Sequence, residues 1–242
     1  MNQNHHIFRS VGCIATILTL SLSAKAQDAT HHRARAMQLP SGQFVTPTAI
    51  SGALQQYLNP RLPAYPKFIA GEAVRSQLSP DGTTLAVLCA GNNSLYDADG
   101  KVDTGASTQF IFLYDVAGRN QYAPALKQVI QQANAHVGLA FSPDGKALYA
   151  AGGRDDAVYA YTNNGSSWSL SNVIDLGHGG VGLGIKVAPN TSGLAVSKDG
   201  KTLVAVNNYN DSISVVDLAT GTVRYEYDLR PYTATNEGKT GG

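Results

Sequence analysis

The chain has 242 residues, of which 43% are hydrophobic and 14% are charged. This length allows one large domain or two small ones, and the composition is that of a globular protein rather than a disordered one. The formal net charge is +1, which provides no electrostatic field for holding a polyanion, so nonspecific binding to nucleic acid is not expected.

The first 26 residues have the pattern of a secretory signal peptide. Arg9 precedes an apolar run over 11–20, and Ala24 and Ala26 form an A-x-A cleavage site. The run is shorter than the roughly 20 residues of a spanning helix, so we expect export to the periplasm or the medium with no membrane span after cleavage. Cleavage leaves 16 basic and 17 acidic residues, a net charge of −1. Cys89 is then the single cysteine, and its apolar neighbours indicate a buried core residue.

Residues 27–66 contain five prolines and little hydrophobic periodicity. We interpret them as an extended lead-in that packs across the main domain, with one short helix around Ala49 to Leu58. Residues 67–242 form the main domain, and it contains an internal repeat.

A four-residue turn motif occurs three times in this domain. Its copies are Ser79-Pro80-Asp81-Gly82, Ser142-Pro143-Asp144-Gly145 and Ser197-Lys198-Asp199-Gly200. Apolar stretches flank each copy. Because the Asp side chain can accept backbone N–H bonds and Gly can adopt a positive φ, each copy predicts a tight hairpin turn.

Two further strands are expected after each hairpin. The third strands are predicted over 110–116, 157–162 and 212–218, and fourth strands over 167–176 and 222–229. Four antiparallel strands per repeat are typical of a β-propeller blade.

The repeat spacing requires insertions. The motif copies are 63 and 55 residues apart, against roughly 40 to 45 for a typical propeller repeat. The excess is assigned to insertions centred on 91–107 and over 177–192. Apolar residues at 126, 129, 130 and 133 fit helical spacing, but the repeat requires a fourth strand there, so we predict a strand over 125–133.

The segment 207–221 resembles the YVTN-type propeller repeat, in which an Asn-rich loop precedes a strand that ends in Asp and a Thr-Gly turn. The matching residues are Asn207, Asn208, Asp217, Thr220 and Gly221. The lead-in is similar to the start of bacterial YncE-like propellers, which a phosphoesterase domain of the alkaline-phosphatase superfamily commonly follows. The resemblance implies an all-β fold, a partial β-propeller of WD40 or YVTN type with about three four-stranded antiparallel blades. Three blades do not close a propeller, so we expect the chain to be the front part of a longer protein or a truncated reading frame. The resemblance implies that a phosphoesterase domain follows, although nothing in these 242 residues matches such a domain.

One face of such a propeller should carry the binding site. The connections between the second and third strands and between blades emerge on the same face, and both insertions lie in these connections. Loops elaborated on a rigid scaffold commonly bind ligands. The candidate ligand-binding residues on this face are His136, Arg154, Asp155, Asp156, His178, Asn207, Asn208, Tyr209 and Asn210. We identify no catalytic set, no metal site and no cofactor.

Three weaker patterns have simpler explanations. Residues 177–182 match G-x-G-x-x-G but precede another blade instead of opening a helix, so no dinucleotide site is predicted. Asp97, Asp99 and Asp103 depart from the calcium-loop spacing and lack its distal Glu, which indicates a solvated acidic turn. His136 and His178 could meet near the channel, but their spacing fixes no carboxylate partner.

The sequence leaves three functions open. The leading hypothesis is an exported binding or interaction module, without catalysis in this segment, whose ligand or protein partner contacts the long-loop face. The first alternative is a lactonase-type propeller hydrolase, which requires convergent titratable groups at the channel mouth. The second alternative is single-stranded nucleic-acid binding, with which some YncE-like proteins are credited. It needs a basic groove with stacking aromatics, and the net charge opposes it.

Overall fold

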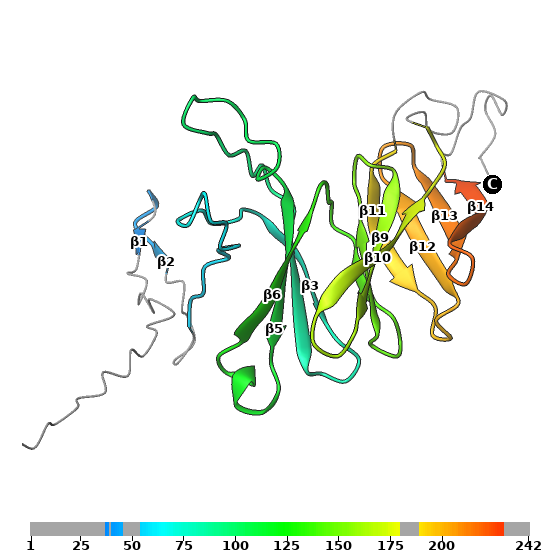
Figure 1. Cartoon of the computed structure of the whole chain (residues 1–242), viewed down its shortest axis with the longest axis horizontal. Helices are drawn as coiled ribbons and strands as arrows, with labels where there is room; N and C mark the ends of the chain where they lie inside the picture. The colour runs from blue at the N-terminus through cyan, green and yellow to red at the C-terminus, as the bar shows by residue number, and fades with distance from the viewer. Residues whose placement is uncertain (1–36, 39, 46–53, 180–188, 230–242) are drawn as a thin grey trace, which may run out of the picture.

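The computed structural model describes residues 37–38, 40–45, 54–179 and 189–229 (Figure 1). The predicted signal peptide lies outside these ranges, as does the first part of the helix expected around Ala49 to Leu58. Residues 54–58 form no helix, and Leu58 packs against a hydrophobic cluster of the main domain instead. No helix in the described ranges is long and apolar enough to cross a membrane.

Three four-stranded antiparallel sheets follow one another along the chain (Figure 1). Blade 1 consists of β3 (Ala73–Leu78), β4 (Thr84–Cys89), β5 (Gln109–Asp115) and β6 (Ala125–Gln132). Blade 2 consists of β7 (Leu139–Phe141), β8 (Ala147–Ala151), β9 (Ala157–Asn163) and β10 (Trp168–Asp175). Blade 3 consists of β11 (Thr191–Val196), β12 (Thr202–Asn207), β13 (Ser212–Asp217) and β14 (Thr222–Asp228). Within each blade, strands that follow one another in the chain are hydrogen-bonded neighbours. The predicted fold class, a partial β-propeller, is confirmed.

Three short elements of the described residues lie outside the blades. The strands β1 (Met37–Gln38) and β2 (Phe44–Val45) pair in the lead-in. The 3₁₀ turn η1 (Gly118–Gln121) connects β5 to β6.

The three copies of the turn motif form the same structure. In the first copy, Asp81 Oδ1 accepts hydrogen bonds from the Ser79 hydroxyl at 2.6 Å and the Thr83 amide at 3.0 Å. Gly82 has a φ of 71°, a conformation that glycine adopts without strain. The Ser-to-Asp bond recurs at 2.6 Å in the second and third copies, where Gly145 and Gly200 both have a φ of 70°. The motif therefore connects the first two strands of every blade.

The strand predicted against its helical spacing, β6, is confirmed, and a β-bulge explains the spacing. Leu113 pairs with Gln128 while Tyr114 pairs with Leu126, so one residue of β6 is skipped. The skipped residue places Leu126 and Val129 on the same face of blade 1, although they are three positions apart. A bulged strand can thus carry the apolar spacing of a helix.

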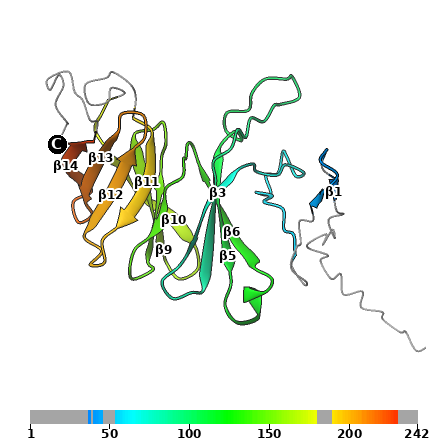
Figure 2. The same cartoon turned by 180° about the vertical axis from the view of Figure 1, so that it is seen from behind.

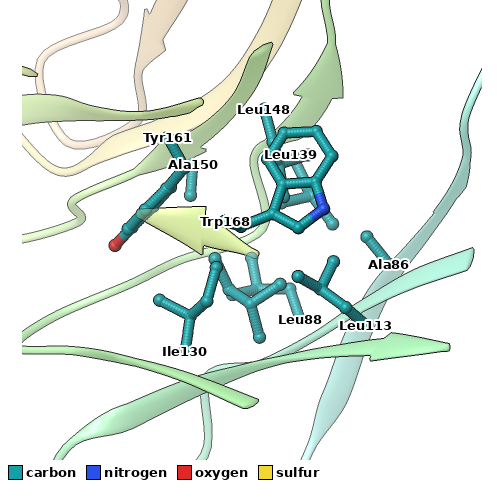
Figure 3. Close-up of a cluster of buried hydrophobic side chains, with 10 residues drawn as sticks. Ala86, Leu88, Leu113, Ile130, Leu139, Leu148, Ala150, Tyr161 and Trp168 are labelled. Carbon is teal, nitrogen blue, oxygen red and sulfur yellow. The ribbon is translucent and has the colours of Figure 1, made fainter. Parts of the chain in front are cut away.

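The blades pack face to face. Leu88 and Leu113 of blade 1 meet Leu148 and Trp168 of blade 2 in one buried cluster (Figure 3). Trp168 also contacts the ring of Phe141 edge-on, with centroids 5.7 Å apart. A second cluster joins blades 2 and 3 and includes Val158, Ile174, Leu203 and Val216. Burial of these apolar faces holds the three sheets together.

The innermost strand β7 contacts both β3 and β11, and the three blades lie side by side in chain order in both views of the molecule (Figures 1 and 2). Gly138, just before β7, permits the closest approach. A Cβ atom at this position would lie 2.0 Å from the carbonyl oxygen of Ser192, where no side chain fits. The glycine is therefore required by the contact between blades 2 and 3.

The outer face of blade 1 and the outer face of blade 3 differ in how they are covered. On blade 1, Leu58, Leu62 and Phe68 of the lead-in pack against a cluster that contains Phe110 and Phe112. On blade 3, the apolar side chains of Val206, Tyr225 and Tyr227 are exposed.

Candidate functional site

The nine predicted binding residues lie at one end of the blades, opposite the Asp-Gly turns. They belong to the β8–β9 turn, the end of β12 and the β12–β13 turn, and the connections that precede β7 and β11. Direct contacts join these segments: Gly153 pairs with Thr191, and the Asn208 amide donates to the Asn190 carbonyl at 3.0 Å. We call this end the loop face. Whether these residues bind a ligand stays a prediction, but the structure divides them into two groups.

The first group is buried between blades 2 and 3. It consists of Asp156, His178, Asn207 and Asn210, each at most 9% exposed. Both nitrogens of the His178 ring lie 2.6 Å from carboxylate oxygens, Nδ1 from Asp156 and Nε2 from Glu226 on β14. Burial lowers the pKa of His178, and the hydrogen bonds to Asp156 and Glu226 raise it by more, so its pKa lies above the ordinary 6.5. The side chains of Asp156, His178 and Glu226 are therefore hydrogen-bonded to one another.

The buried network continues into blade 3 through hydroxyl and amide groups. The Ser212 hydroxyl lies 2.9 Å from Glu226 Oε1 and 3.1 Å from Asn210 Oδ1. Asn207 Nδ2 donates to the hydroxyls of Ser212 and Ser214 at 3.0 and 2.9 Å. The Asn-rich turn thus supports the structure of blade 3 as well as its loop face.

The second group is exposed or half-buried. Arg154, Asp155, Asn208 and Tyr209 are exposed, and His136 is half-buried. Asp155 accepts hydrogen bonds from the Tyr159 hydroxyl and the Asn134 amide, both at 2.6 Å. Burial, together with the hydrogen bond to Asp155, raises the pKa of Tyr159 to about 12. Asp155 is therefore held in place, whereas Arg154 has no partner among the described residues.

His136 precedes β7, whose Leu139 lines a groove along the innermost strands. Its Nδ1 is 3.0 Å from the Ser192 hydroxyl, and no described residue bonds its Nε2. The next residue, Val137, accepts a hydrogen bond at 3.0 Å from Nε of Arg75 on β3. This bond holds the Nε atom of Arg75 in place. The two terminal nitrogens of the guanidinium have no partner in the described part of the chain.

This groove has a volume of about 210 Å³. Arg75 and Gln77 line it together with the apolar side chains of Leu139, Leu194, Val204 and Val206. A guanidinium and an amide beside an apolar wall suit a small ligand with an oxygen-rich end. Arg75, Gln77 and Ser192 were not among the predicted residues, because each lies within a strand and no local motif marks it as part of a site.

The insertion at 91–107 forms a hairpin arm that projects upward from blade 1 in Figure 1. Asp97 Oδ1 accepts from the amides of Asp99 and Lys101, both at 2.9 Å, and Asp103 Oδ2 accepts from the Tyr65 hydroxyl at 2.9 Å. These carboxylates organise the arm itself. The described residues contain no group of three or more His, Cys, Asp or Glu side chains placed to hold a metal ion.

The glycine-rich motif at 177–182 lies partly outside the described residues. Residues 177–179 form no helix. Gly177 instead donates its amide hydrogen to Asp175 Oδ1 at 2.8 Å, within the connection after β10.

Comparison with known proteins places the fold. No protein-family model matches the sequence, and neither does any curated protein. The solved structure of a periplasmic gluconolactonase from Pseudomonas aeruginosa matches with a TM-score of 0.50 and 17% identity, covering 80% of this chain and 49% of that chain. The structure of a protein from Lactobacillus plantarum matches with a TM-score of 0.51 and 15% identity, covering 81% and 50%. The chain spans about half the length of these proteins. At these identities the likeness establishes the fold alone: the described residues of this chain have the β-propeller fold, in three blades.

Proposed function

We propose that this chain contributes three blades to an exported propeller hydrolase of the lactonase type, whose active site lies where the groove meets the loop face. In this proposal residues 1–26 are the signal peptide, 27–66 the lead-in and 67–242 the partial propeller. The fold likeness to a periplasmic gluconolactonase supports both the reaction class and export. The alternative hydrolase hypothesis is therefore preferred over the leading binding-module hypothesis of the sequence analysis.

One observation carries the proposal, the environment of His136. When Nδ1 donates to the Ser192 hydroxyl 3.0 Å away, Nε2 is the unprotonated nitrogen, and no described residue occupies it. A half-buried imidazole with one fixed and one open nitrogen is suited to general base catalysis. The guanidinium of Arg75, anchored on the carbonyl oxygen of the adjacent residue Val137, can supply positive charge.

The chemistry follows from these two groups. His136 Nε2 takes a proton from water as the water oxygen attacks the lactone carbonyl carbon. Arg75 stabilises the negative charge that develops on the carbonyl oxygen. The ring C–O bond then breaks, His136 returns the proton to the leaving alkoxide, and the product is an open-chain hydroxy acid that ionises at neutral pH.

The experiment measures the hydrolysis of D-glucono-δ-lactone by the full chain. Acid release is recorded in a pH-stat, and its rate is compared with the rate of spontaneous hydrolysis. General base catalysis contributes about 10²–10⁴-fold, so His136→Gln should lower kcat by at least about 100-fold. Tyr122→Ser, at the opposite end of blade 1 and 79% exposed, is the control and should keep the parent rate. Hydrolysis no faster than the spontaneous rate, or a fully active His136→Gln, would refute the proposal.

A binding module without catalysis is the second candidate. The observation in its favour is that Asp155, Asp156 and His178 are occupied by protein partners, which leaves Arg154 and Tyr209 as contact residues. Calorimetric titration with gluconate distinguishes the two: binding that Arg154→Ala and Tyr209→Ala weaken, without lactone turnover, supports the module. The YncE-like relationship with a following phosphoesterase, and the weaker alternative of single-stranded nucleic-acid binding, stay predictions from the sequence.

A further inference from the structure

The ring of His178 bridges blades 2 and 3. The side chain is 4% exposed and lies in the connection between β10 and β11. Its Nδ1 contacts Asp156, 22 residues earlier in the β8–β9 turn, and its Nε2 contacts Glu226, 48 residues later on β14. Three segments far apart in the sequence thus meet at one imidazole.

The geometry of this cluster requires a proton. An ionised carboxylate accepts hydrogen bonds and donates none, and a neutral imidazole has a single N–H. If His178 were neutral and both carboxylates ionised, one of the two 2.6 Å contacts would join two acceptors. Both contacts are satisfied only when the cluster holds one additional proton, on the ring or shared with Glu226.

The remaining hydrogen bonds of the cluster do not need that proton. Asp156 Oδ2 accepts the backbone N–H of His178 at 2.8 Å. The Ser212 hydroxyl lies 2.9 Å from Glu226 Oε1, so it is available to donate to the same oxygen that faces the ring. The additional proton is therefore needed only for the contacts between the ring and the two carboxylates.

We propose that Asp156, His178 and Glu226 form a proton-dependent clasp between blades 2 and 3, closed while the cluster holds its proton and weakened when the proton leaves. The clasp fixes the β8–β9 turn and the start of the connection to β11, both of which border the loop face. An exported protein meets the pH of its surroundings, so the clasp couples that pH to the contact between two blades. This inference is independent of the proposed hydrolysis.

The direction of the pH dependence follows from the raised pKa of His178. Burial lowers this pKa, and hydrogen bonds to Asp156 and Glu226, then their charges, raise it above 6.5 overall. Asp156 and Glu226 are the charged groups among the described residues that act on the ring. Because the folded pKa exceeds the unfolded one, the stabilisation is complete below pH 6.5 and is lost as the pH rises through the folded pKa. Over that interval the unfolding equilibrium constant rises by up to about tenfold per pH unit.

The variant Glu226→Gln separates the proton from the hydrogen bonds. The amide group can donate to Nε2 of a neutral ring and to the Ser212 oxygen, so the contacts are kept without the additional proton. Urea unfolding of the full chain is measured from pH 6 to pH 9 for the parent and the variant. We expect the unfolding equilibrium constant of the parent to increase more steeply with pH than that of the variant, with a cumulative difference of about tenfold for each pH unit between the two pKa values.

The control is Glu72→Gln, which removes an exposed carboxylate remote from the cluster and should keep the pH profile of the parent. Equal slopes for the parent and Glu226→Gln would overturn the proposal. If Glu226→Gln does not fold, the ring nitrogens of His178 are titrated by NMR in the parent chain. A midpoint above 6.5 supports the clasp, and a midpoint at or below 6.5 overturns it.

Discussion

The substitution Gly138→Ala tests how closely the innermost strands of blades 2 and 3 approach each other. The added Cβ would lie 2.0 Å from the Ser192 carbonyl oxygen, 2.7 Å from Leu194 Cγ and 2.8 Å from Ala151 Cβ. Ordinary van der Waals contact begins at 3.4 Å, and the nearest of these atoms belongs to the backbone, which cannot rotate away. The strand β11 must therefore shift as a whole.

The expected cost is that of overpacking a closely packed interior, about 1–3 kcal/mol. In a chain of this size each kcal/mol lowers Tm by about 2–4 °C, so Gly138→Ala should lower Tm by about 2–12 °C. The assay is thermal and urea unfolding followed by circular dichroism.

Gly193→Ala on the neighbouring strand is the matched control. Its Cβ would lie 3.4 Å from Val206 Cγ2, an ordinary contact. We expect it to be neutral or to stabilise the protein by up to about 1 kcal/mol, because alanine restricts the unfolded chain. If Gly138→Ala unfolds at the same temperature as Gly193→Ala, the close approach of the two blades is refuted.

Three further predictions concern the core and the turns. Leu88 is fully buried between blades 1 and 2, so Leu88→Ala should lower the free energy of unfolding by about 2–5 kcal/mol. Leu170 is 52% exposed, so the control Leu170→Ala should change that free energy by at most about 0.5 kcal/mol. Similar losses of unfolding free energy in the two variants would contradict the interblade core. Burial raises the pKa of Cys89 to about 11, so its thiol should react with a disulfide reagent at pH 8 only after urea is added, and rapid labelling of the folded chain would show that it is accessible. A hydrogen bond from the Ser142 hydroxyl, and to a lesser extent one from the Lys146 amide, lowers the pKa of Asp144 below 3.8. The stability that Asp144 contributes is therefore present above pH 3.8 and is lost as the pH falls through the pKa of the folded state. Ser142→Ala should move the midpoint of acid unfolding to higher pH, and an unchanged midpoint would contradict this role.

The blades could be predicted from sequence because their signals are local. Each hairpin is specified by four consecutive residues, in which the Ser and Asp side chains satisfy the turn and glycine provides the positive φ. The repeat also identified β6 correctly against its own apolar spacing. The bulge that produces this spacing could not be predicted, because it depends on the pairing of Leu126 with Tyr114 on another strand.

The candidate site was predictable only in its general position. The order of strands places the β8–β9 turn, the β12–β13 turn and the interblade connections at the same end, so the nine residues share one face. Their division into buried and exposed groups depends on contacts between distant segments. The carboxylate partners of His178 are Asp156 and Glu226, 22 and 48 residues away, and no local pattern connects them.

The groove was missed for the same reason. Arg75 is fixed by the carbonyl oxygen of Val137 in the next blade, and Ser192 contacts His136 from a third blade. Such pairs become visible only when the innermost strands are placed side by side.

The central claim is that the three repeats form separate blades stacked in order, and a cross-linking measurement tests it most directly. A Cβ at Gly145 would lie 3.5 Å from Pro80 Cδ, so the turns of blades 1 and 2 are in contact. Full-length chains carrying Pro80→Cys with Gly145→Cys, or Pro80→Cys with Gly200→Cys, are oxidised and analysed for an intramolecular disulfide. The stacked blades predict a bridge in the first pair and none in the second. A bridge that forms only between positions 80 and 200, or equally in both pairs, would contradict this order.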